Sequence, residues 1–65
     1  MTRAELIEKG EKQLNYIWDK AEEAYPSNNT EWARKGLNQL DMFNYLLDEE
    51  YENYDLWFNR FMELL

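Results

Sequence analysis

The sequence predicts an all-α domain, and its composition and residue spacing both support that prediction. The 65 residues include no valine and only four isoleucine and threonine residues together, although strands concentrate β-branched side chains. Only two glycines and one proline interrupt the chain. Apolar residues recur at intervals of three and four, which is the spacing of one helix face. A chain of this length corresponds to a single helical domain over residues 1–65.

The first helix is expected over about residues 2–25. Thr2 and Glu5 have the spacing of a capping box, in which the hydroxyl and the carboxylate each cover a backbone N–H group. The helix must end before Pro26, because a residue that precedes proline is pushed toward extended geometry. Apolar and small residues define its inward face: Ile7, Gly10, Leu14, Ile17, Ala21 and Ala24.

The second helix is expected to begin near Asn29 or Thr30, either of which can act as its N-cap. From there the apolar spacing continues to Leu65, with Asn44 as the one strongly polar residue on the stripe. This continuity allows two architectures. In the first, the segment breaks and a small three-helix bundle forms. In the second, one long helix makes a hairpin with the first helix, and two hairpins dimerise into a four-helix bundle.

Local electrostatics favours the three-helix bundle, with helices over about residues 2–25, 30–47 and 50–64. Five acids lie between residues 48 and 55, and like charges three or four positions apart destabilise a continuous helix. If Asp48 instead caps a new helix, the next two acids fall in its first turn, where the helix dipole favours negative charge.

Large rings are expected to fill the core of so short a chain. Phe43, Phe58 and Phe61 are the rings assigned to the interior, whereas the pattern leaves Tyr45 and Trp57 open between core and surface. Gly10 occupies a core-facing position where a larger residue would normally stand. We therefore expect a ring from the region 58–61 to pack over its bare backbone.

The residue types argue against an enzyme. The chain has no histidine and no cysteine, so the commonest general base and the strongest nucleophile are absent. The run over residues 48–55 has the density of oxygen ligands of a calcium loop, but it lacks the glycine at the sixth position that makes the turn of an EF-hand. The sequence therefore predicts no catalytic residues, no cofactor and no metal site.

Charge and hydropathy also limit the classes of partner that the chain is expected to bind. The longest uninterrupted apolar runs are three residues, far short of the roughly 20 that a membrane span requires, so we expect a cytoplasmic protein without membrane contact. The net charge is −7. Direct binding to nucleic acid is disfavoured, because such proteins neutralise phosphates with a basic patch.

Acids and aromatic residues both concentrate in the second half of the chain. Residues 1–35 carry seven acids and six bases, whereas residues 36–65 carry seven acids and Arg60 alone. This imbalance opposes folding through self-repulsion, and rings interleaved with carboxylates are typical of an interface. The predicted partner-binding residues are Asp48, Glu49, Glu50, Glu52 and Asp55 for electrostatic steering, with Tyr51 and Tyr54 as aromatic anchors.

These features predict a small acidic protein-binding module, an inhibitor or adaptor that engages a basic surface of a partner protein, including a surface that normally binds nucleic acid. The small acidic inhibitors that phages and mobile elements use against host enzymes are similar in size and charge, a likeness of composition alone. The alternatives are a self-assembling structural domain, whose carboxy-terminal aromatics form a homodimer core, and a designed helical miniprotein.

Overall fold

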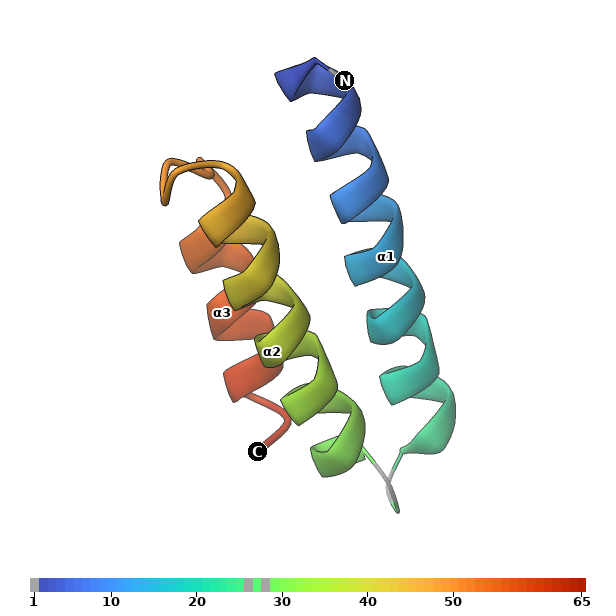
Figure 1. Cartoon of the computed structure of the whole chain (residues 1–65). Helices are drawn as coiled ribbons and strands as arrows, with labels where there is room; N and C mark the ends of the chain where they lie inside the picture. Colours follow the sequence, from blue (N-terminus) through green and yellow to red (C-terminus); the bar gives the residue numbers. More distant parts are fainter. Residues whose placement is uncertain (1, 26, 28) are drawn as a thin grey trace.

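A computed structural model describes residues 2–25, 27 and 29–65, and over these residues the chain forms three α-helices and no strand. Helix α1 (Arg3–Ala24) and helix α2 (Asn29–Leu46) make an antiparallel hairpin, and helix α3 (Tyr54–Met62) runs back alongside it (Figure 1). The N-terminus lies at the same end as the α2–α3 turn (Figure 1). The predicted three-helix bundle is confirmed, and the alternative of one long second helix is wrong.

Helix α1 begins and ends where the sequence indicates. The Thr2 hydroxyl accepts a hydrogen bond from the Glu5 backbone N–H at 3.1 Å and donates to the Glu5 carboxylate at 3.2 Å. The Glu5 carboxylate therefore accepts a hydrogen bond from the Thr2 hydroxyl, whereas in a full capping box it would accept one from the Thr2 backbone N–H. Tyr25, which precedes Pro26, has an extended conformation with φ −59° and ψ 137°. That conformation ends the helix.

Helix α2 ends within one residue of the predicted position, but the turn that follows it differs from the prediction. The Asp48 N–H donates to the Tyr45 carbonyl at 3.0 Å, and the Glu49 N–H donates to the Asn44 carbonyl at 2.8 Å, which is the bonding pattern of a Schellman motif. Asp48 and Glu49 both have left-handed φ angles, 57° and 61°. Because a right-handed helix requires negative φ, Glu49 cannot be the first residue of a helix capped by Asp48, and α3 begins only at Tyr54.

The start of α2 is tied to the end of the chain. Asn29 and Thr30, expected as alternative N-caps, are the first two residues of the helix itself. Their side chains donate to the Leu64 carbonyl, each at 3.5 Å. The position that would cap this helix, residue 28, lies outside the described residues.

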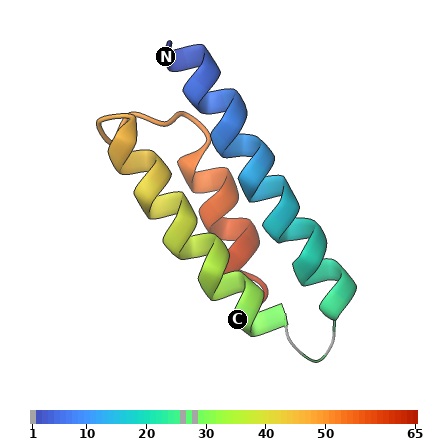
Figure 2. The ribbon, with the colours of Figure 1, turned by 45° about the vertical axis from the view of Figure 1, so that its right-hand side comes forward.

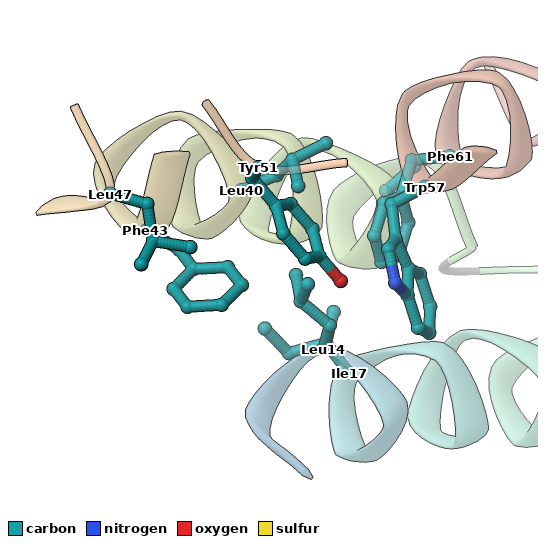
Figure 3. Close-up of a cluster of buried hydrophobic side chains, with 9 residues drawn as sticks. Leu14, Ile17, Leu40, Phe43, Leu47, Tyr51, Trp57 and Phe61 are labelled. Atoms are coloured by element: carbon teal, nitrogen blue, oxygen red, sulfur yellow. The ribbon is translucent and has the colours of Figure 1, made fainter. Parts of the chain in front are cut away.

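Aromatic rings packed over glycines build the core. A Cβ atom on Gly10 would lie closer to the Phe43 ring than the 3.0 Å that real Cβ contacts respect, and the same holds for Gly36 under Phe61. A ring over Gly10 is therefore confirmed, but it comes from α2, because the antiparallel hairpin brings Phe43 to the level of Gly10. Figure 3 shows these rings with their neighbours. The buried hydrophobic residues are Leu14, Ile17, Ala21, Ala33, Leu40, Phe43, Leu47, Tyr51, Trp57 and Phe61.

Candidate partner-binding site

The five carboxylates expected to steer a partner are all exposed at one end of the bundle, in the α2–α3 turn and the first turn of α3. We call them the acidic strip: Asp48, Glu49, Glu50, Glu52 and Asp55. The N-terminal end of α1 lies beside them (Figure 1). The structure therefore gathers these charges at one place without burying any of them.

One base from the first half of the chain reaches the acidic strip. The Arg3 guanidinium lies 2.8 Å from the Glu52 carboxylate and donates to the Glu50 carbonyl at the same distance. Hydrogen bonding to the Glu52 backbone N–H and then to Arg3 lowers the pKa of the Glu52 carboxyl. An exposed pair of this kind contributes little to stability, but it compensates part of the charge. The other four acids of the strip form no ion pair with any described residue.

Tyr51 belongs to the core, which corrects its expected role as an anchor. Its side chain is 5% exposed, and its ring packs edge-on against Phe43 with centroids 4.7 Å apart. The hydroxyl points toward α1 (Figure 3) and donates to the Glu11 carboxylate. Burial, followed by this hydrogen bond, raises the pKa of Tyr51 well above its usual range. Its ring is covered because the turn before α3 folds back over the end of the hairpin.

Tyr54 is half-buried and held against α2. Its hydroxyl donates to the Asp41 carboxylate at 2.8 Å, and this hydrogen bond, followed by burial, raises the pKa of Tyr54. Its ring stacks on Phe58 with centroids 5.8 Å apart. Phe58, expected in the core, is 36% exposed, because Trp57 and Phe61 take the inward positions of α3. Tyr54 therefore presents only part of its ring to a partner.

Two exposed side chains lie next to the acidic strip: Tyr45, which the sequence left open between core and surface, and Leu46, which the sequence reasoning missed. Tyr45 is 74% exposed and Leu46 is 58% exposed. Leu46 and Asp48 line two adjoining hollows of about 320 and 520 Å³. The available signal was that both apolar residues fall off the buried stripe of α2. An apolar residue on the outer side of a helix is a contact candidate when acidic residues surround it.

The carboxylates of the acidic strip and the side chains of Tyr45 and Leu46 all lie at the surface of this end of the bundle. Over the described residues, no group of three or more carboxylates is placed to hold a metal ion. The side chains at this end combine exposed charge with exposed apolar area, which is the composition of an interface rim and its contact residues.

Comparisons with family models, with curated proteins and with solved structures found no match to this chain. Within the described residues, no helix has the length and the apolar character needed to cross a membrane.

Proposed function

We propose that this chain is a protein-binding module whose acidic end engages a basic surface on a partner protein, as an inhibitor or adaptor. The observation that carries the proposal is the juxtaposition of the acidic strip with the exposed side chains of Tyr45 and Leu46. Charges at a rim steer the encounter and speed association, whereas apolar contacts slow dissociation once water is excluded. Both components lie within one end of the bundle.

The arrangement of the basic residues supports this proposal. Lys35 lies over the Trp32 ring at 4.5 Å, and Arg60 lies over the Trp57 ring at 5.0 Å. Lys12 and Lys20 pair with acids of α1. These positive charges are engaged away from the acidic strip, so its negative potential is left largely uncompensated. A basic partner surface, such as one that normally holds nucleic acid, supplies the missing countercharge.

A homodimer built on the carboxy-terminal rings has less support. Such a dimer needs those rings as its shared core, but Tyr51, Trp57 and Phe61 are buried within a single copy. Trp57 and Phe61 stack on each other, and Phe61 also meets the Trp18 ring of α1. The monomer therefore already uses the aromatic area that this homodimer would require.

The test begins with affinity capture of a partner by the tagged chain and continues with a charge variant. The variant Glu49→Gln/Glu50→Gln/Asp55→Asn removes three strip charges that have no ion pair among the described residues. A matched control, Glu22→Gln/Glu31→Gln/Glu63→Gln, removes three exposed charges elsewhere. We expect the strip variant to weaken binding about tenfold or more, chiefly through slower association, and the control to change it about twofold at most.

Two results would contradict the proposal. Equal losses in the two variants would show that only the net charge matters. Unchanged binding by the strip variant would show that the strip is a solvated surface. Raised salt should weaken wild-type binding steeply, because exposed charges are screened beyond about 8 Å at physiological ionic strength.

A further inference from the structure

A continuous groove runs along the surface between α1 and α2. It consists of three adjoining hollows of about 340, 220 and 320 Å³. Shared lining residues join them in series: Gln13, Gln39 and Met42 link the first to the second, and Leu6 and Leu46 link the second to the third. We call this feature the α1–α2 groove. Its last hollow opens at the acidic strip.

The α1–α2 groove lies on the side of the helix pair that α3 leaves open. On α1, the third helix contacts Trp18 and the turn before it contacts Glu11, and neither residue lines the groove. The same turn also contacts Arg3, which lines only the last hollow, at the end of the groove. No described residue of α3 lines the groove. Figure 2 shows α3 running beside both other helices. The same helix pair is therefore covered by a helix on one side and uncovered on the other.

Charge changes along the groove. Lys9 and Lys35 line its first two hollows, and no acid does among the described residues. Asp48 and Glu50 line the last hollow together with Arg3. The Arg3 guanidinium already pairs with Glu52, so the two carboxylates set the charge of this end. In a chain with twice as many acids as bases, a groove with a positive end and a negative end fits a ligand with the opposite polarity.

The apolar floor and the length of the groove suit an α-helix. Met42 is 62% exposed and Tyr16 is 49% exposed, so apolar area is available between the charged ends. From Trp32 to Leu46 the groove follows about four turns of α2, roughly 21 Å at 1.5 Å per residue. Amphipathic helices bind in grooves of this form through apolar residues spaced three and four apart. Helix α3 already packs in this way on the other side.

We propose that the α1–α2 groove binds one amphipathic α-helix of the partner protein. Its apolar face lies on Tyr16, Met42 and Leu46. Basic residues at one end reach Asp48 and Glu50, and an acid at the other end meets Lys35. This inference rests on the proposed function, since it specifies which segment of the basic partner is recognised.

The test uses a synthetic peptide of about 16 residues, enough to span the groove as a helix. The peptide carries leucines on one helical face, three lysines at one end and one glutamate at the other. A control peptide has the same composition, with its leucines scattered around the helix. Titration into the isotopically labelled full chain, followed by amide NMR shifts, reports affinity and location. We expect the first peptide to shift the amide resonances of the groove residues and to bind about tenfold more tightly than the control peptide.

A pair of protein variants locates the contact. Met42→Gln keeps helix propensity but removes an apolar side chain from the groove, whereas Leu56→Gln makes the same kind of change at an exposed site on α3. We expect Met42→Gln to weaken peptide binding about fivefold or more, as truncation of a contact residue does. Leu56→Gln should leave the affinity within about twofold, because its site makes no contact in this mode.

The outcomes separate this inference from the proposed function. Equal affinity of the two peptides, shifts confined to the acidic strip, or no binding of either peptide would overturn the groove as a helix site. None of these results would alter the partner's dependence on the strip. Loss of the proposed function would appear separately, as a captured partner indifferent to the strip variant.

Discussion

The ring of Phe61 packs directly on the bare backbone of Gly36, so that α3 approaches α2 more closely than any side chain at that position would allow. Glycine in mid-helix costs roughly 0.5–1 kcal/mol relative to alanine. The close approach offsets that cost, because it seats the fully buried Phe61 ring against α2 and the Trp18 ring of α1. A short α3 is thereby held by aromatic contacts.

Gly36→Ala should destabilise the protein, although alanine is the better helix former. A gain of about 0.5–1 kcal/mol in helix propensity is outweighed by overpacking against a buried ring, typically about 1–3 kcal/mol. We expect thermal unfolding to shift down by several degrees, at about 4–8 °C for each kcal/mol in a domain of this size. Asn38→Ala, at an exposed position of α2, is the control and should not lower Tm. A higher Tm for Gly36→Ala would show that the Phe61 ring moves aside freely.

The parts of the fold that local chemistry determines were predictable from the sequence. The limits of α1 follow from the Thr2 cap and from Pro26, and both signals act within a few residues. The sequence predicted the break after α2 at the correct place, but it attributed the break to a new helix capped by Asp48. The left-handed turn at Asp48 has no glycine to mark it, and it depends on hydrogen bonds back to Asn44.

The candidate site was harder to predict, because periodicity shows which residues share a face but not what covers that face. Tyr51 lies on the apolar stripe and is buried only because the turn returns it to Glu11 on α1. Tyr45 and Leu46 lie off the stripe and gain importance only beside the acidic strip. Both placements depend on contacts between elements distant in the sequence.

Tyr51→Phe should lower the stability of the protein at neutral pH. It should also make the variant lose less stability than the wild type does when the pH becomes alkaline. The substitution removes the hydrogen bond to the Glu11 carboxylate, and a hydrogen bond to a charged group is worth about 1.5–3 kcal/mol. The folded state raises the pKa of Tyr51 above the unfolded value of 10.0. The stability from its neutral form is therefore complete below that value and is lost as the pH rises beyond it.

Urea unfolding at about pH 8 and about pH 11, on either side of the ordinary tyrosine pKa, tests this prediction. Between these two pH values, the free energy of unfolding should fall more for the wild type than for Tyr51→Phe. Tyr45→Phe, at an exposed ring, is the control and should follow the wild type. If the wild type and Tyr51→Phe lost stability in parallel, the buried hydroxyl would have no part in the alkaline transition.

Asn44→Leu should destabilise the protein, although it completes the apolar stripe. The Asn44 side-chain oxygen accepts a hydrogen bond from the Tyr51 backbone N–H at 3.2 Å. Leucine leaves that partly buried donor without its partner, at a cost of about 1–3 kcal/mol. Asn44→Asp keeps an acceptor oxygen and should lose less. Thermal unfolding of the three proteins decides the matter, and a rise in Tm for the leucine variant would refute the role of this amide.

Asp48→Gly should stabilise the fold through the backbone. Asp48 has a φ of 57° and occupies the position after the α2 C-cap where glycine is commonest. A residue with a Cβ atom pays about 1–2 kcal/mol in that conformation, whereas glycine avoids the clash but loses more entropy on folding. We expect a net gain of about 0.5–1 kcal/mol. Asp48→Ala is the matched control, since it removes the same charge and keeps the Cβ atom.

Because both variants relieve the repulsion among the acids of the strip equally, their difference isolates the backbone contribution. The Tm of Asp48→Gly should lie several degrees above that of the wild type, since each kcal/mol corresponds to about 4–8 °C in a domain of this size. The Tm of Asp48→Ala should stay close to that of the wild type. Equal rises in the two variants would instead attribute the gain to charge. In that case repulsion among the acids of the strip, and not the left-handed backbone of the turn, would limit the stability of the fold.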